Sequence, residues 1–207
     1  AIEQTNLPFE IIVVNDGSTD GVDESSFSEQ VNYIYKEHSG RLETRLKGLE
    51  AAIFPNILFI DSRVWLEGDS LSNLSRLTEE NPTSRFWNGY IILNSSSPIS
   101  SIWETLVGVG WKRISKTDTV KFDISEFDQY PKGTGFFLAS KSDWALAFGK
   151  MESHLNPRVP ISDDTKLLRE FARISEIWIS GQVSARYISR DTLGAFLRNS
   201  FYRGQTF

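Results

Sequence analysis

Short apolar runs alternate with helix-like segments along the first half of the chain. Residues 10–15 (EIIVVN), 31–35 and 57–60 are β-branched or apolar runs of the length expected for strands. Residues 40–53 place apolar side chains at spacings of four, three and four, which is one face of an amphipathic helix, and leucines recur similarly over residues 69–79. This alternation predicts an α/β fold with a mostly parallel central sheet flanked by helices.

The second half has a less regular pattern. We expect strands over residues 86–93, 135–139, 176–179 and 183–187, and helices over residues 142–149, 163–174 and 192–203. Residues 102–130 mix tryptophan, glycine and charged residues without a period, and they predict no particular element. No repeat or linker divides the chain, so we expect a single domain over residues 1–207.

Composition excludes several classes of chemistry. The 207 residues contain no cysteine and only two histidines, His38 and His154, which rules out disulfides, thiol nucleophiles and multi-histidine metal sites. The net charge is −5, from 22 basic and 27 acidic residues, so we expect no nucleic-acid partner. Pro55 and Asn56 interrupt the longest apolar stretch, residues 51–60. We therefore expect no transmembrane segment and a cytoplasmic location.

Two carboxylates directly follow predicted strands. Asp16 comes after residues 10–15, and Asp61 comes after residues 57–60. In an open α/β sheet, ligands bind outside the carboxyl ends of the strands. Carboxylates at that edge can accept hydrogen bonds from a nucleobase or a ribose, or bind a divalent cation. The alternative for Asp16 is that it only shapes an Asx turn before Gly17.

Two further acidic residues, Asp163 and Asp164, open the predicted helix 163–174, with Ser162 as a plausible N-cap. Acidic side chains in a first helical turn are favoured by the helix dipole alone. Taken by itself, this pair therefore needs no chemical role.

A hydrolase motif also occurs. Residues 68–72 spell GDSLS, the string around the nucleophile of GDSL-type hydrolases. Those enzymes need an acidic residue three positions before the catalytic histidine, and here Met151 stands three residues before His154. The serine would lack its base, so a GDSL-type hydrolase is the weakest alternative.

Five segments carry motifs in a fixed order. They are residues 10–20 (EIIVVNDGSTD), 40–49 (G-x4-R-x2-G-L), 57–63 (ILFIDSR), 132–139 (KGTGFFLA) and 162–167 (SDD-x2-L). In the same order they resemble the strings EIIVVDDGSxD, G-x4-R-N-x-G, flDxD, G-x4-f-r and ED of the family 2 glycosyltransferases, which have the GT-A fold. The resemblance implies an inverting transferase, used in polysaccharide biosynthesis, that moves a sugar from a nucleotide-diphosphate sugar to an acceptor hydroxyl.

The resemblance also implies a role for each motif. Residues 1–94 would form the nucleotide-binding half and residues 95–207 the acceptor-binding half. Donor contacts would come from the first three motifs: Asp16, Gly17 and Ser18 at the nucleobase or ribose, Arg45 near the base or the diphosphate, and Asp61 at the ribose, the diphosphate or a metal. Asp164 would be the general base that takes the proton of the acceptor hydroxyl. An aspartate with an ordinary pKa near ~3.9 is ionised at neutral pH and ready for that task.

Arginines depart from the family pattern at two places. Arg63 replaces the last aspartate of DxD, which is the family's metal ligand, and a guanidinium has no lone pair to offer a cation. Either Asp61 binds Mg²⁺ or Mn²⁺ alone through waters, or Arg63 is itself the cation beside the diphosphate; a solvated surface arginine is the plain alternative. Arg186 falls near the place of a family histidine, with Arg190 after it, and both could reach the diphosphate. The processive-synthase signature Q-x-x-R-W is absent.

The start of the sequence also departs from the family. The family's first buried strand would precede Glu10 by about ten or more residues, and residues 1–7 resemble the end of the helix that follows it, so this sequence is expected to lack that strand. Either the strand belongs to a longer chain, or a naturally complete chain would leave an open slot in its sheet. The expected partners are a nucleotide-sugar donor and a saccharide or lipid-linked acceptor, with a location at the inner face of the membrane left open. A non-catalytic GT-A module that binds a nucleotide without transfer is the leading alternative.

Overall fold

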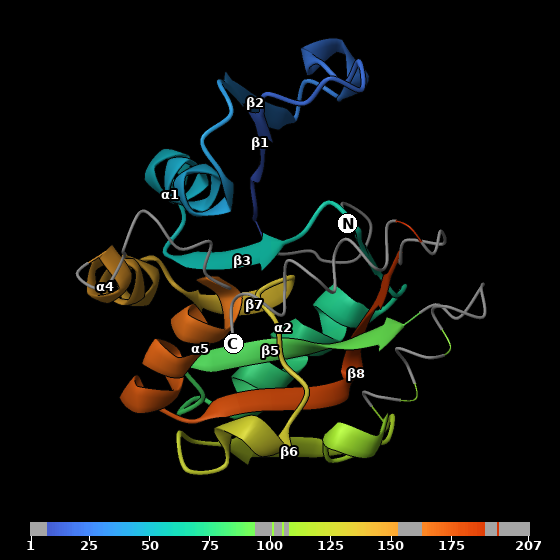
Figure 1. Cartoon of the computed structure of the whole chain (residues 1–207). Coiled ribbons are helices and arrows are strands. Elements are labelled where there is room, and N and C mark those ends of the chain that lie inside the picture. The colour runs from blue at the N-terminus through green and yellow to red at the C-terminus, as the bar shows by residue number, and fades with distance from the viewer. Residues whose placement is uncertain are drawn as a thin grey trace.

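A computed structural model describes residues 8–93, 101, 105, 108–152, 163–188 and 194. The strands are β1 (Ile11–Asp16), β2 (Val31–Lys36), β3 (Asn56–Ile60), β4 (Val64–Leu66), β5 (Phe86–Leu93), β6 (Thr119–Phe122), β7 (Phe136–Ser140) and β8 (Ile177–Tyr187). The α-helices are α1 (Arg41–Ala51), α2 (Ser70–Glu80), α4 (Lys141–Glu152) and α5 (Asp163–Ile174), with short 3₁₀ turns η2 (Glu24–Ser26) and η3 (Phe127–Gln129) (Figure 1). The α/β class expected from the sequence is confirmed. Of the helix expected over residues 192–203, only residue 194 lies within the described residues.

The main sheet is mixed, which corrects the expectation of a mostly parallel sheet. Six strands are joined in the order β3-β7-β5-β8-β4, with β6 also paired to β8. Within this sheet only β5 and β8 run parallel, and the other four pairings are antiparallel. Neither β3 nor β4 is paired with the strand that follows it in the chain, and β6 and β7 are joined through the 3₁₀ turn η3 without a described α-helix between them, so a single crossover helix does not set these neighbours parallel.

The last strand is longer than the sequence suggested. Residues 176–179 and 183–187 were expected as two strands, but β8 runs without a break from Ile177 to Tyr187. Its pairing with β5 shifts register between Gly89 and Tyr90, so the ladder skips residues of β8. Such an irregularity bends a strand without ending it. Gly181 and Gln182, which lie between the two expected strands, are within this irregular stretch.

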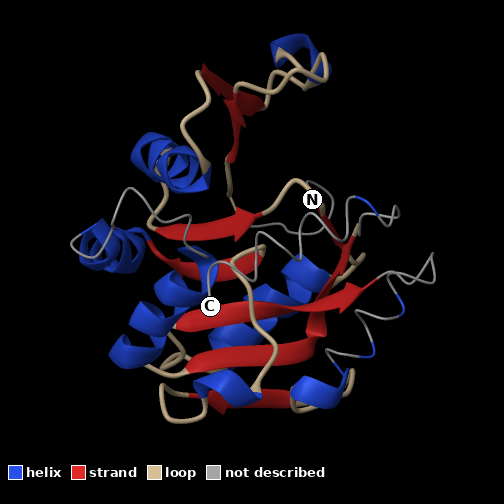
Figure 2. Ribbon diagram, in the orientation of Figure 1, coloured by secondary structure: helices blue, strands red, loops and turns tan. Residues whose placement is uncertain are grey.

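Helices cover both faces of the main sheet (Figure 2). One apolar cluster joins α4 and α5 to the sheet, and Trp144, Phe148 and Phe171 are among its fully buried side chains. The smaller cluster on the other face includes Leu74 and Leu77 of α2. The periodicity of α1, α2 and α5 in the sequence predicted these buried faces because each helix needs one apolar stripe to pack on the sheet.

Strands β1 and β2 form a separate parallel pair beyond β3 (Figure 1). Among the described residues, neither strand is hydrogen-bonded to the main sheet. The residues of β1 are only half-buried, apart from Asn15, although the run read as a fully buried strand. Helix α1 packs against both the β1–β2 pair and the main sheet. A Cβ on Gly48 would lie 3.5 Å from Val14 of β1 and 4.0 Å from Phe59 of β3. No helix in the described ranges is long and apolar enough to cross a bilayer.

Candidate active site

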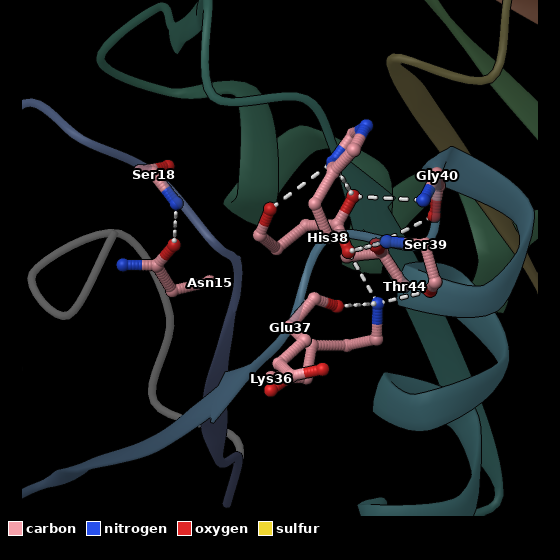
Figure 3. A network of polar contacts seen from close by, with 9 residues as sticks. Asn15, Ser18, Lys36, Glu37, His38, Ser39, Gly40 and Thr44 are labelled. Carbon is pink, nitrogen blue, oxygen red and sulfur yellow. Dashed lines mark hydrogen bonds and ion pairs between the residues drawn. The ribbon is translucent and has the colours of Figure 1, made fainter.

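Asp16 ends β1, and its carboxylate is bonded to the loop that leads from β2 into α1. Figure 3 labels Lys36, Ser39 and Gly40, which line this loop. Asp16 Oδ1 accepts hydrogen bonds from Lys36 Nζ and from the Ser39 N–H at 3.0 Å. Its Oδ2 accepts from the Gly40 N–H at 3.0 Å and lies 2.9 Å from His38 Nδ1. The carboxylate therefore fixes the position at which helix α1 begins.

The side chain that is hydrogen-bonded to the loop after β1 belongs to Asn15, the neighbour of Asp16. The Ser18 N–H donates to Asn15 Oδ1 at 2.8 Å, and Asn15 Nδ2 donates to Tyr33 Oη at 2.7 Å. Gly17 has φ +71, and a Cβ there would lie 3.0 Å from the His38 backbone nitrogen, so only glycine fits. The alternative in which Asp16 only shapes an Asx turn is therefore wrong, because its carboxylate accepts hydrogen bonds from Lys36, Ser39 and Gly40 instead.

The environment of Asp16 favours its ionised form. Burial raises the pKa of this carboxyl, but the hydrogen bond from Lys36 and those from the backbone of Ser39 and Gly40 outweigh it and hold the pKa well below its ordinary value. Asp16 is consequently a fixed negative charge at neutral pH.

A second network centres on Arg45, a buried arginine of α1. Its Nη1 donates to Asp164 Oδ1 at 2.7 Å, and its Nη2 donates to Thr134 Oγ1 at 2.7 Å. The same Nη2 lies 3.3 Å from Asp61 Oδ1. Thr134 closes the ring by donating from Oγ1 to Asp164 Oδ1 at 2.7 Å. Four residues that are distant in the sequence therefore share one hydrogen-bonded cluster.

Each member of this cluster is placed by a different element. Arg45 lies one turn into α1, Asp61 follows the end of β3, and Asp164 lies in the first turn of α5. Thr134 lies in the loop before β7, where Asn88 of β5 accepts the Gly133 N–H at 3.0 Å. Helix α1 thus connects the two networks, since Asp16 fixes its start and Arg45 extends from its body.

Thr134 was not singled out from the sequence. It lies inside the KGTG segment that resembles a family strand, but a threonine in a glycine-rich loop carries no chemical signal of its own. It is 1% exposed, and a buried hydroxyl needs a partner, which here is Asp164. Only the fold brings Thr134 to that carboxylate.

Asp164 also remains ionised at neutral pH. Burial raises the pKa of its carboxyl, but the charges of Arg45 and Arg41 and the hydrogen bonds from Arg45 and Thr134 outweigh it, so its pKa is lowered. Arg41 Nη1 is 3.6 Å from Asp164 Oδ2. A carboxylate held in this way can accept a proton from a hydroxyl over the whole neutral range.

The surroundings of Asp61 do not form a protein cage for a divalent cation. Its Oδ1 faces Arg45, and in the described ranges no group of three histidine, aspartate or glutamate side chains could hold a metal ion. Mg²⁺ and similar ions take about six oxygen ligands. Arg63 lies two residues on and is partly buried, and among the described residues its guanidinium forms no ion pair. A cation here would depend on oxygens of the bound donor.

The remaining candidates lie apart from the Arg45 network. Arg186 on β8 donates from Nε to Glu67 Oε1, opposite Trp65 of β4. Arg190 and the predicted N-cap Ser162 are outside the described residues. Ser70 of the GDSLS string is buried, and its hydroxyl donates to the Ser184 carbonyl. That burial agrees with the rejection of a hydrolase.

The sequence matches a known family over more than half its length. The family model described as Glycosyl transferase family 2 covers residues 1–125. The chain is 35% identical to Glycosyltransferase GlyA of Streptococcus pneumoniae over 100 residues. This aligned region covers 46% of this chain and 14% of that protein. The chain is also 37% identical to Putative glycosyltransferase EpsH of Bacillus subtilis over 78 residues. This region covers 35% of this chain and 23% of that protein. The chain therefore spans only a small part of these curated relatives.

Solved structures share the fold. The crystal structure of S. aureus TarS 1–349 in complex with UDP-GlcNAc has a TM-score of 0.59 at 14% identity, over 92% of this chain and 53% of that one. The complex of the same protein with UDP has a TM-score of 0.59 at 12% identity, and the match covers 96% of this chain and 56% of that one. At such low identity the likeness shows a common fold, which is the GT-A fold expected from the sequence.

Proposed function

Because the chain belongs to glycosyl transferase family 2, we propose that it transfers a sugar from a nucleotide-diphosphate sugar to an acceptor hydroxyl with inversion at the anomeric carbon. The observation that carries the proposal is Asp164, an ionised carboxylate hydrogen-bonded to Arg45 and Thr134. It stands at the second acidic position of the family motif ED. A general base of this kind contributes typically ~10²- to 10⁴-fold to the rate.

The chemistry needs one proton acceptor and one stabilised leaving group. Asp164 takes the proton of the acceptor hydroxyl as that oxygen attacks the anomeric carbon. The bond from this carbon to the diphosphate oxygen breaks, and the nucleoside diphosphate leaves with the electron pair on the opposite face. Because the attack is direct and needs a single base, the anomeric configuration inverts.

The leaving diphosphate gains negative charge and needs cations or hydrogen-bond donors nearby. Among the described residues, Arg45 lies within 4 Å of both Asp164 and Asp61, and Arg41 lies within 4 Å of Asp164, so these two arginines of α1 are our first candidates for that charge. Arg63 follows Asp61 and is our third candidate. Mg²⁺ or Mn²⁺ would supply the same charge if Asp61 and the bound donor held it together.

The donor would lie along the first half of the chain. Asp16, Gly17 and Ser18 form the loop after β1, which would hold the nucleobase or ribose, and Asp61 would face the ribose or the diphosphate. TarS, whose fold is similar, was crystallised with UDP-GlcNAc and with UDP, which supports a nucleotide-sugar donor. The elements after β5 would form the acceptor side, where a saccharide or a lipid-linked saccharide would bind.

Calorimetry combined with a turnover assay tests this proposal. We expect one of UDP, GDP and dTDP to bind, and its nucleotide sugar to be consumed slowly even without an acceptor. Asp164→Asn should bind the same nucleotide and turn over far more slowly. Binding without turnover of any donor would favour the non-catalytic module, and absence of nucleotide binding would contradict both alternatives.

A further inference from the structure

The two oxygens of Asp164 have different surroundings. Oδ1 accepts two hydrogen bonds, from Arg45 Nη1 and from Thr134 Oγ1, each at 2.7 Å. Oδ2 has Arg41 Nη1 at 3.6 Å, beyond hydrogen-bonding distance, and it accepts no hydrogen bond from the described part of the chain. The carboxylate is therefore asymmetric before any substrate binds.

We infer that Thr134 is a positioning residue, whose hydroxyl fixes Oδ1 of Asp164 and so leaves Oδ2 as the oxygen that takes the acceptor proton. This inference rests on the proposed role of Asp164 as general base. It adds a residue that the motifs did not identify and names the atom that accepts the proton.

The direction of the Thr134 hydrogen bond follows from its partners. A hydroxyl has one proton, and Arg45 Nη2 already donates to Thr134 Oγ1, so the single Thr134 proton points to Asp164. A proton on Oδ1 would compete with both donors, whereas a proton on Oδ2 leaves both bonds intact. Protonation is therefore directed to Oδ2.

The backbone around Thr134 is held rigidly. Asn88 is 1% exposed, and its Oδ1 accepts the Gly133 N–H while its Nδ2 donates to the Gly89 carbonyl at 2.8 Å. Thr134 itself is buried, so its hydroxyl cannot turn to water as an alternative partner. A group that orients a base works only if its own position is fixed.

Other charged groups near Asp164 would stay in place if the hydroxyl were removed. Arg41 and Arg45 face Asp164 from α1, and Asp61 lies on the other side of Arg45 after β3. Thr134→Val keeps these charges and nearly keeps the volume, and it removes two hydrogen bonds: the one donated to the ionised Asp164 and the one accepted from Arg45 Nη2. The pKa of Asp164 should then rise, because the first of these bonds lowers it.

The test combines an NMR titration with kinetics. The carboxyl ¹³C signal of Asp164, assigned by its absence in Asp164→Asn, is followed against pH in wild type, Thr134→Val and Thr134→Ser. We expect Val to raise the pKa of Asp164, to move the acid limb of kcat/KM to higher pH and to lower kcat by roughly 10-fold with little change in donor affinity. Thr134→Ser keeps a hydroxyl, so its Asp164 pKa, its acid limb of kcat/KM and its kcat should lie close to those of wild type.

Thr78→Val is the matched control. Its hydroxyl donates to the Ser75 carbonyl at 2.7 Å on α2, across the sheet from the site, so the pKa of Asp164 and kcat should not change. If Thr134→Val does not fold, Thr134→Ala, which cannot clash, takes its place. The inference would be overturned if the pKa of Asp164 were unchanged after loss of the hydroxyl. It would also be overturned if Thr134→Ser shifted that pKa as far as Thr134→Val does. The NMR result holds even if no donor is turned over, so a failure of the proposed function would be recognised separately.

Discussion

Arg45 is the residue on which the candidate site depends most. It is 8% exposed, and its guanidinium contacts two carboxylates and one hydroxyl from three other segments. A buried guanidinium is tolerated only if its donors and its charge are matched, and here Asp61 and Asp164 supply both. Because the arginine lowers the pKa of Asp164, the same contact that stabilises the fold keeps the base ionised.

Replacing the base should separate binding from catalysis. We expect Asp164→Asn to keep its affinity for the nucleotide and to lower turnover at least ~100-fold, because an amide cannot take the acceptor proton. Steady-state kinetics with calorimetric titration of the nucleotide measure the two effects. Turnover within threefold of wild type would remove Asp164 as the base.

Asp16 should make stability depend on pH in the acid range. Its pKa is lowered in the folded protein, so its stabilising contribution is present above the unfolded value of ~3.9 and is lost as the pH falls through the folded value. Asp16→Asn should be less stable than wild type at pH 7, and the gap should narrow as the pH falls below about 4. Urea unfolding at pH 7, 5 and 3 measures the gap, and a gap that is the same at every pH would contradict the ion-pair account.

Elements were more predictable than their pairing. Helix α5 begins and ends where its periodicity predicted, and the ranges of β2, β5 and α2 agree within a residue or two, because each has a clear apolar pattern or turn signal. The direction of β7 and the continuity of β8 were not predictable, since they depend on contacts between distant strands. In the site, Asp16, Arg45, Asp61 and Asp164 were singled out by motif, whereas Thr134 and the bridging position of Arg45 needed the fold.

The contact between β5 and β7 gives a test at the level of elements. A Cβ on Gly89 of β5 would lie 2.1 Å from the ring of Phe136 on β7, which is buried. We expect Gly89→Ala to lower the free energy of unfolding by about 1–3 kcal/mol, the usual cost of overpacking a core. Gly149→Ala is the control: this exposed position on α4 has no atom within 4 Å of the added Cβ, so alanine should stabilise by up to about 1 kcal/mol. Equal urea midpoints for the two variants would contradict this packing.

At the scale of the whole molecule, helix α1 connects two parts of the fold. Asp16, at the end of the β1–β2 pair, holds the start of α1, while Arg45 on the same helix reaches residues fixed by the main sheet and α5. A donor bound at the β1 loop and an acceptor bound near Asp164 would therefore meet across one rigid helix. This arrangement suits a transfer that needs both substrates in line.

Metal dependence gives a prediction at this scale. Arg63 stands where the family has a metal ligand, and a fixed cation stabilises a leaving diphosphate as a divalent ion would. We expect activity to survive EDTA, and Arg63→Asp to create a metal requirement or abolish turnover. Arg76→Ala, at an arginine of α2 paired with Glu80, should have no effect. The opposite result would show that Asp61 binds an ion instead: turnover is lost completely with EDTA, is restored by Mn²⁺, and is unchanged in Arg63→Ala.

The central claim, a direct displacement assisted by the single base Asp164, is tested most directly by the anomer that is released first. With water as the acceptor, ¹H NMR can follow slow hydrolysis of an α-linked nucleotide sugar that the protein binds. Early in the reaction, before mutarotation, the account predicts the β-anomer of the free sugar, and only traces of it with Asp164→Asn. The α-anomer as first product, or the β-anomer formed at the same rate by Asp164→Asn, would contradict it.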